Sequence, residues 1–320
     1  RRNGDSMKII YPEYQTATGS TATSENGSYP VSNLFDDKPG KLWKAADSVQ
    51  VATLRIAITT TSDAVALFKT NATSAVCTIT LDSAEKAMSA SPAVNAGGGL
   101  VKLQIPAHGM SAGQVVLING TTNYDGVHTL PSQALGDAGN LIITATYVAE
   151  TPAVTDTACV VVETTTHTLS ATRIYDRFWQ EYTSQVAAHT ATIELTTTAT
   201  TIEAGVVKAG TTVDFRNPSY GLSEGVLDYS TVEELSNGAK YVDTRDIVRS
   251  FGINVITTRA SEFYALRDII HAYGKTPMAA LIAEDILDME WCCFGTIESF
   301  SGSHQYLNHS GVSITFEETV

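Results

Sequence analysis

Serine and histidine residues that could supply a nucleophile and a base gather in one polar segment near the C-terminus. Ser301, Ser303 and Ser310 lie close in the sequence to His304 and His309, and these are residue types of a Ser/His/Asp catalytic site. A segment rich in Ser, Gly and His is far more often a turn, and the chain contains no nucleophile elbow, phosphate-binding loop, zinc-protease helix or dinucleotide fingerprint. We therefore expect a protein that is not an enzyme.

Neighbouring carboxylates are the second candidate, because such pairs can bind calcium or serve as the acid and base of a glycosidase. Adjacent side chains on a strand point to opposite faces, so most such pairs in a chain of net charge −14 are solvated surface. A structural calcium ion at Asp36 and Asp37 stays open as an alternative, although no EF-hand spacing is present. No other cofactor is expected. The pairs are Asp36–Asp37, Glu233–Glu234 and Glu284–Asp285 with Asp288.

A loop near the N-terminus that contains aromatic and charged residues is the third candidate. Tyr29, Asp36, Trp43 and Lys44 combine flat rings with hydrogen-bonding groups, a combination by which protein surfaces bind sugars or other proteins. The alternative is that Trp43 closes the end of a β-sandwich. We keep these four residues as the candidate contact for a glycan or a protein partner, and we assign no catalytic, cofactor or metal residue.

The overall composition excludes several partners. The chain has 320 residues, of which 43% are hydrophobic and 17% are charged, so its order must come from packed apolar surface. Its 20 Lys and Arg residues are outnumbered by 34 Asp and Glu residues, which is the wrong balance for the phosphate contacts that drive nucleic-acid binding. No apolar run approaches the roughly 20 residues that cross a bilayer. We expect neither nucleic-acid binding nor membrane insertion.

The four cysteines form neither a disulfide framework nor a metal-binding pattern. Cys77 and Cys159 lie in alternating apolar runs, and Cys292 and Cys293 are adjacent in a predicted strand, so they should point to opposite faces. We expect buried free thiols, which behave as small hydrophobic groups and fit assembly in a reducing compartment.

Short runs rich in Thr, Val, Ile and Ala predict strands over most of the first two thirds of the chain. In residues 75–81 and 191–195 apolar and polar side chains alternate, which is typical of an antiparallel sheet with one buried face. A β-sandwich satisfies this pattern best. The predicted strands here are residues 51–58, 64–69, 76–81 and 190–196.

A stretch with its own turn signals interrupts the sandwich pattern. Glycines at 97–99 open it, and a Thr-rich run at 164–168 closes it. We therefore predict a discontinuous sandwich, residues 7–95 plus 166–204, around a small inserted β module, residues 96–165. The strands predicted inside the module are residues 100–105, 114–118, 127–130 and 140–147.

The remaining residues, 205–320, predict a β-rich α+β unit, so the fold class is mainly β with one packed helix. Apolar residues at three-to-four spacing predict that helix over 261–273, with Ser261 as its N-cap and Gly274 just after its end. An Asn-Gly pair at 237–238 predicts a tight hairpin turn. The predicted strands are residues 242–256, 278–283, 290–297 and 312–316.

The segment 29–44 resembles the opening of galactose-binding-like, discoidin-type jelly rolls. That family has a small residue, Asn, two apolar residues, Asp, Gly or Asp, a short loop and then Trp. This chain matches the pattern at Asp36 and Trp43 and departs from it at Asp37, where glycine is frequent. The resemblance implies a jelly roll whose Asp and Trp shape the loop at the end of the sandwich.

Two further parts of the chain resemble bacteriophage proteins. Residues 107–118 and 122–128 resemble a small β module that recurs in virion proteins, and residues 213–218, 245–249 and 293–297 are similar to structural proteins encoded among the tail genes of long-tailed phages. The resemblance to distal tail proteins implies a hexameric ring below the tail tube. It also implies the tail tube and other tail-tip proteins as partners, in a virion assembled in the cytoplasm of the bacterial host.

The resulting hypothesis is a structural protein of the phage tail tip or baseplate that self-associates and carries peripheral modules. Low charge density and many apolar β runs fit large subunit interfaces, and the polar stretches 217–224 and 299–310 are candidate contacts. The alternatives are a virion adhesin that binds host glycan through the four-residue contact, a capsid decoration or neck protein and, last, a tail protein that degrades polysaccharide.

Overall fold

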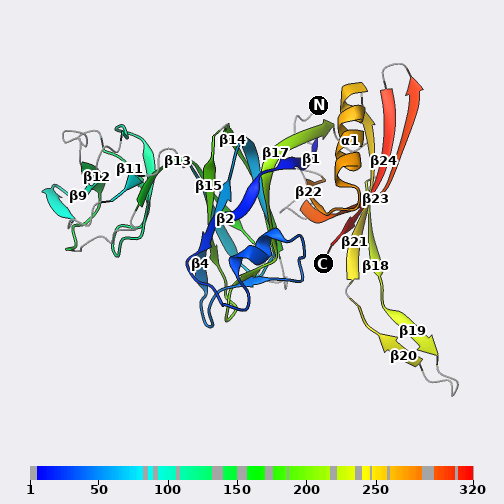
Figure 1. The fold of residues 1–320 in the computed structure, drawn as a ribbon, viewed down its shortest axis with the longest axis horizontal. Helices are drawn as coiled ribbons and strands as arrows, with labels where there is room; N and C mark the ends of the chain where they lie inside the picture. The colour runs from blue at the N-terminus through cyan, green and yellow to red at the C-terminus, as the bar shows by residue number, and fades with distance from the viewer. Residues whose placement is uncertain are drawn as a thin grey trace.

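The fold is described by a computed structural model, and it is mainly β, as the sequence predicts. Figure 1 shows three parts in a row, with a small β module at one end, a sandwich in the middle and a sheet covered by one helix at the other end. The residues described are 6–81, 86–88, 93–105, 109–131, 140–149, 157–169, 176–185, 187–216, 222–234, 240–245, 247–257, 260–282, 292–306 and 309–319.

Two sheets form the central sandwich. The period-two pattern of β4 explains its core, because Leu54 and Ile56 are buried inside while Thr53 and Arg55 lie on the outer face. Ala191, Ile193 and Leu195 repeat this arrangement on the neighbouring strand. The first sheet holds β2 (Gln15–Ala22), β4 (Val51–Ile58), β15 (His189–Thr196), β6 (Ser74–Leu81) and β13 (Thr157–Thr168). The second holds β14 (Asp176–Gln185), β5 (Ser62–Thr70), β17 (Val206–Arg216) and β1 (Ser6–Glu13).

The inserted module has a hydrophobic core of its own, which includes Leu103, Ile118, Tyr124 and Ile143. The long strand β13 connects the module to the sandwich, because its first residues pair with β10 and the rest pair with β6. The Thr-rich run 164–168 is therefore not a closing linker but part of this shared strand. The strands of the module are β7 (Lys86–Ala87), β8 (Val94–Gly97), β9 (Leu100–Gln104), β10 (Val115–Asn119), β11 (Gly126–Thr129) and β12 (Asn140–Thr144).

A single nine-stranded sheet runs from the sandwich into the C-terminal unit, in the order β14-β5-β17-β1-β22-β23-β24-β21-β18. Strand β1 is the link, since it pairs with β17 on one side and with β22 on the other. The predicted boundary at residue 205 consequently falls just before a strand that belongs to both parts. The C-terminal strands are β18 (Ser223–Asp228), β21 (Ile247–Thr257), β22 (Met278–Leu281), β23 (Cys292–Tyr306) and β24 (His309–Glu318).

This sheet curls so that its two halves face each other. Ala64, Phe68 and Trp179 from the sandwich half share one core cluster with Leu281 and Phe294 from the C-terminal half, and the rings of Phe68 and Phe294 are 5.6 Å apart. Small side chains in the concave face allow this close packing.

The predicted helix is confirmed as α1 (Ala260–Tyr273), and it covers the outer face of the C-terminal sheet (Figure 1). Phe263, Leu266 and Ile269 are buried against that face. Gly274 ends the helix with a φ of 56°, and its N–H donates to the carbonyl oxygen of Ile270 at 2.8 Å. The helix begins at Ala260, so Ser261 lies in the first turn rather than before it.

Two hairpins extend beyond the body of the C-terminal unit (Figure 1). The polar stretch 299–310, which the sequence offered as a candidate subunit contact, contributes to the hairpin of β23 and β24. The predicted strand 242–256 is two strands, the end of β20 (Lys240–Asp243) and most of β21, and β20 pairs with β19 (Thr231–Glu234). The predicted Asn-Gly turn lies outside the described residues. The remaining short elements are η1 (Val31–Phe35), β3 (Trp43–Lys44) and β16 (Glu203–Ala204).

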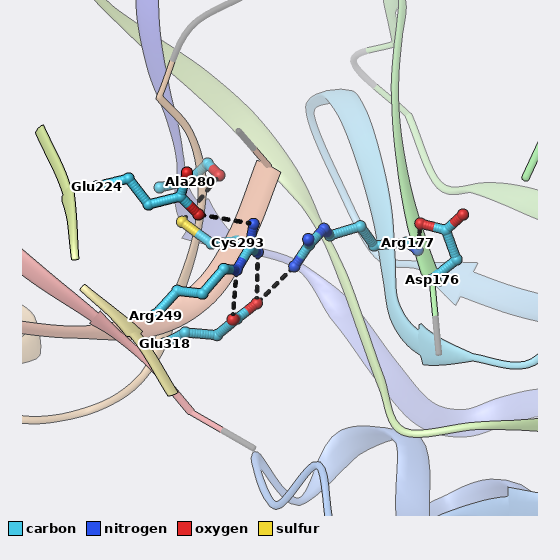
Figure 2. Close-up of polar contacts among 7 residues, drawn as sticks. All are labelled: Asp176, Arg177, Glu224, Arg249, Ala280, Cys293 and Glu318. Atoms are coloured by element: carbon cyan, nitrogen blue, oxygen red, sulfur yellow. Dashed lines mark hydrogen bonds and ion pairs between the residues drawn. The ribbon is translucent and has the colours of Figure 1, made fainter. Parts of the chain in front are cut away.

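A carboxylate held between two guanidinium groups ties the curled sheet together (Figure 2). Glu318 on β24 accepts hydrogen bonds from Arg249 Nε and Nη2 of β21, both at 2.8 Å, and from Arg177 of β14. Burial alone would raise the pKa of Glu318, but hydrogen bonds and charge from Arg249 and Arg177 outweigh it, so the pKa lies below its ordinary value. One side chain thus links the sandwich half to the C-terminal half.

We expect Glu318→Gln to lower the free energy of unfolding by about 3 kcal/mol, because two partly buried guanidinium groups would face a neutral amide. Denaturant unfolding at neutral pH measures this loss. Glu298→Gln is the matched control, since it removes an ion pair between Glu298 and the exposed Lys275 and should cost less than about 1 kcal/mol. Equal, small losses in both variants would contradict a linking role for Glu318.

The same carboxylate predicts a pH dependence. Its pKa is lower in the folded state, so its contribution is complete above the unfolded-state pKa of about 4.3 and is lost as the pH falls through the lower folded-state pKa. Between about pH 6 and pH 3, wild type should therefore lose more stability than Glu318→Gln. Parallel stability curves for the two proteins over this range would rule the linkage out.

Candidate functional site

The structure brings together two of the four residues of the candidate glycan or partner contact. Lys44 Nζ lies 5.0 Å from the centre of the Tyr29 ring, and Tyr29 is exposed. The same Nζ forms an ion pair of 2.7 Å with Glu203 Oε2. The ammonium group of Lys44 is therefore engaged by Tyr29 and Glu203 within the chain. Of the four candidate residues, Tyr29 alone is largely exposed to a partner.

Trp43 is not available to a glycan. Its side chain is 0% exposed and belongs to the sandwich core, and β3 holds it by pairing Trp43 with Ala204 of β16. The alternative, that Trp43 closes the end of the sandwich, is the one that the structure supports. A sugar cannot stack on this ring without opening the core.

Asp36 and Asp37 have separate ionic partners. Asp36 Oδ2 lies 3.0 Å from Lys41 Nζ, and Asp36 Oδ1 accepts the N–H of Lys38 at 3.1 Å, so the residue shapes its own loop. Asp37 Oδ1 lies 2.7 Å from the buried Lys208 Nζ. Within the described ranges no group of three or more His, Cys, Asp or Glu side chains is placed to hold a metal ion. A calcium ion would have to displace these lysines.

The expectation of buried free thiols is confirmed for Cys77, Cys292 and Cys293. Cys292 and Cys293 point to opposite faces of β23, because one lies in the core of the curl and the other in the core under α1. Burial raises the pKa of Cys292 to about 12, so this thiol is inert at neutral pH. The side chain of Cys159 lies outside the described residues.

A buried Ser–His pair, which no sequence motif indicated, resembles a nucleophile and its base. Ser62 Oγ lies 2.7 Å from His189 Nε2 and also bonds the hydroxyl of Tyr182. His189 Nδ1 lies 2.8 Å from the carbonyl oxygen of Ala187, which favours a proton on Nδ1 and leaves Nε2 to accept from Ser62. Ser62 and His189 are fully buried, so no substrate reaches them and the group is structural. The side chains of His304 and His309 lie outside the described residues.

An exposed arm carries many large hydrophobic residues, and we define it as β18, β19 with residues 229–230 between them, β20 and the first residue of β21. Every residue of β18, β19 and β20 is exposed. The arm points away from the body, below the helix-covered sheet (Figure 1). Its large exposed hydrophobic residues are Val226, Leu227, Tyr229, Val232, Tyr241, Val242 and Ile247.

The arm has an ordered base and an unsupported end. At the base, Val226 of β18 is paired with Arg249 of β21, and the hydroxyl of Tyr229 donates to Glu317 of β24. Toward the end, Val232 lies directly opposite Val242 in a two-stranded hairpin. An isolated two-stranded hairpin is marginally stable in water, so the end of the arm gains little stability from its own two strands.

The comparisons with known proteins leave the function open. No known family model matches this sequence, and no curated protein matches it. One similar solved structure is a selenomethionine-labelled mutant of chitosan-binding module 1, derived from a chitosanase/glucanase of Paenibacillus sp. IK-5. It is 12% identical, covers 63% of this chain and 97% of its own, and has a TM-score of 0.31. A likeness at this level carries no functional argument. Within the described ranges no helix is long and apolar enough to span a membrane.

We expect Ser62→Ala to lower the free energy of unfolding by about 1–3 kcal/mol, because it removes a hydrogen-bonding partner from two buried groups, the imidazole of His189 and the hydroxyl of Tyr182. Denaturant unfolding measures the loss. Ser299→Ala, which removes an exposed hydroxyl bonded to Thr315, is the control and should be nearly neutral. Unchanged stability together with loss of a hydrolytic activity would contradict the structural role.

Proposed function

We propose that this chain is a structural subunit that self-associates through the exposed apolar arm, as a component of the tail tip or baseplate of a long-tailed bacteriophage. The observation that carries the proposal is the arm itself, whose strands β18, β19 and β20 are exposed along their whole length. Seven large exposed hydrophobic residues gathered on one extended segment favour an interaction site, although Glu224, Asp228, Glu233, Glu234, Lys240 and Asp243 lie among them. The occupant that we propose is a second copy of this chain.

The position of the arm favours pairing between copies. Strand β18 is the last strand of the nine-stranded sheet, so its outer edge leaves backbone N–H and C=O groups for another strand. An arm that reaches away from its own body contacts a different surface of the next copy. Such head-to-tail contacts form a ring when the rotation closes and a filament when it does not.

The placement in a phage tail rests on the sequence resemblance alone, and the structure shows what the residues of the module's motif do locally. In the motif at 122–128, Asp125 accepts hydrogen bonds from the N–H of Gly120 and from the N–H and hydroxyl of Thr121. The buried Tyr124 donates to the carbonyl oxygen of Val148 at 2.6 Å. The distinctive residues of the motif therefore build a turn and its anchor, as expected of a recurring structural module.

The adhesin alternative loses its main support because Trp43 is buried. A capsid decoration or neck protein would use the same kind of self-association, and only its position in a particle distinguishes it. Antibody labelling of intact virions separates these positions, and label at the tail tip is the expected outcome.

We expect Val242→Asp to sediment as a 34.1 kDa monomer while wild type sediments as a larger oligomer. A carboxylate at this position would have to lose its water in an apolar interface, whereas a single exposed substitution changes folding stability by only about 0.5 kcal/mol. Sedimentation velocity of the full chain at several concentrations measures the difference.

The control is Val94→Asp on the inserted module, because Val94 and Val242 are each 54% exposed on a strand. This variant should assemble like wild type. A wild-type protein that stays monomeric at every concentration, or an assembly equally sensitive to Val94→Asp, would refute the proposal.

A further inference from the structure

A buried lysine lies between two carboxylates where the sandwich meets the curl. Lys208 of β17 is 2% exposed, and its Nζ forms an ion pair of 2.7 Å with Asp37 Oδ1 and a second ion pair with Glu13 Oε2. Val207 and Ala209, its neighbours in the strand, belong to the sandwich core, so the lysine side chain points to the opposite face of the sheet, into the curl. An amine and two carboxyl groups therefore meet at the edge of an apolar core.

The amine of this lysine lies beside apolar side chains of the curl. Lys208 Nζ is 5.6 Å from the centre of the Phe294 ring, and Phe294 belongs to the same core cluster as Phe68 and Val206. This packing keeps bulk water away from the amine. A covalent bond to the nitrogen would be protected from hydrolysis by the same packing.

Glu13 is held in place beside the lysine by two further donors. The hydroxyl of Tyr273 donates to Glu13 Oε1 at 2.8 Å, and Gln15 Nε2 donates to Glu13 Oε2 at 3.0 Å. Burial, followed by the charge and the hydrogen bond of Glu13, raises the pKa of Tyr273, so its hydroxyl keeps its proton and stays a donor. Both oxygens of Glu13 are thus engaged, which suits a group that relays protons from Nζ rather than one that is attacked.

Asp37 meets the lysine from a backbone conformation that is uncommon for a residue with a side chain. It follows η1 in the chain and has a φ of 58°, which lies in the left-handed region. Glycine would adopt this backbone without strain, yet an aspartate stands here with its Oδ1 on Lys208. Because Nζ contacts Oδ1, the carboxyl carbon one bond further is within reach of nucleophilic attack.

We propose that Lys208 and Asp37 condense into an intramolecular amide, an isopeptide bond, with Glu13 as the proton relay. Glu13 takes one proton from the Lys208 ammonium and passes it to the Asp37 carboxylate, which leaves an amine beside a carboxylic acid. The Nζ lone pair attacks Cγ of Asp37 and forms the C–N bond. Glu13 carries a second proton from Nζ to one carboxyl oxygen, the C–O bond to that oxygen breaks, and one water leaves. The reaction needs no oxidant, reductant or other reactant.

Proximity drives the condensation, because two groups fixed in contact react as if at an effective concentration of roughly 10⁵ M or more. The amide ties the loop after η1 to β17, a strand that pairs with β5 on one side and with β1 on the other. An ion pair opens when its carboxylate is protonated, whereas an amide does not. Such a bond suits a structural subunit, and it does not depend on the arm.

Intact mass spectrometry of the full chain, folded and then denatured, tests the proposal. We expect wild type to weigh about 18 Da less than its sequence requires, the mass of one water. A proteolytic digest should contain a branched peptide that joins residues 37 and 208. Asp37→Ala and Lys208→Arg should each have the full sequence mass, because neither can form the amide. Glu13→Gln should lose the water about a hundredfold more slowly or not at all, because it lacks the relay.

Lys8→Arg is the matched control, since Lys8 is 7% exposed in the same sheet and donates to both oxygens of Glu181. It should keep the mass deficit of wild type. Full mass in wild type with no branched peptide, the result expected if the three groups form ion pairs only, overturns the proposal. A branch through Glu13 in place of Asp37, or a deficit that survives Asp37→Ala, also overturns it. The wild-type reading stands even where a variant fails to fold.

Discussion

The structure depends on the double pairing of β1. This strand joins β17 and β22 into one sheet, and its adjacent residues Ile9 and Ile10 enter two different cores, one under α1 and one inside the curl. The pairing requires a glycine at position 210, because a Cβ there would lie 2.1 Å from the carbonyl oxygen of Pro12. The N-terminal strand thereby fixes the direction in which the C-terminal unit, and the arm on it, leaves the sandwich.

Charged side chains are buried at the junction of the curl. Lys8 of β1 lies 2.7 Å from Glu181 of β14, and Lys208 of β17 bonds Glu13 and Asp37 while its Nζ lies 5.6 Å from the ring of Phe294 in the other half. In a chain with so few charged residues, burying several of them at one junction is costly unless each is paired. The cost is offset by these pairs and by Glu318, which bonds Arg177 of one half and Arg249 of the other. A junction with paired charges of this kind suits the proposed subunit, which would present its arm in one orientation.

The sequence predicted the strands and the helix that depend on residues close together in the chain. The run of β-forming residues at 51–58 yields a strand with those same bounds, and the three-to-four spacing of apolar residues over 261–273 yields α1. Pairing across distant segments was not predictable, because nothing in the Thr-rich run of β13 indicates that it joins two modules. The candidate site has the same limit, because the sequence around Trp43 does not tell whether its ring points outward to a ligand or inward to the core. The exposed arm was missed because adjacent apolar residues such as Val226–Leu227 and Tyr241–Val242 do not reveal in the sequence whether a core covers them.

The central claim is that a rigid curled sheet presents the apolar arm to another copy of the chain. Hydrogen–deuterium exchange, read peptide by peptide at low and high protein concentration, tests it most directly. The account predicts that amides of β1 and β22 exchange slowly at both concentrations, while those of β18, β19 and β20 exchange quickly when dilute and become protected when concentrated. Fast exchange in the arm at every concentration, or protection that appears elsewhere on the surface instead, would contradict it.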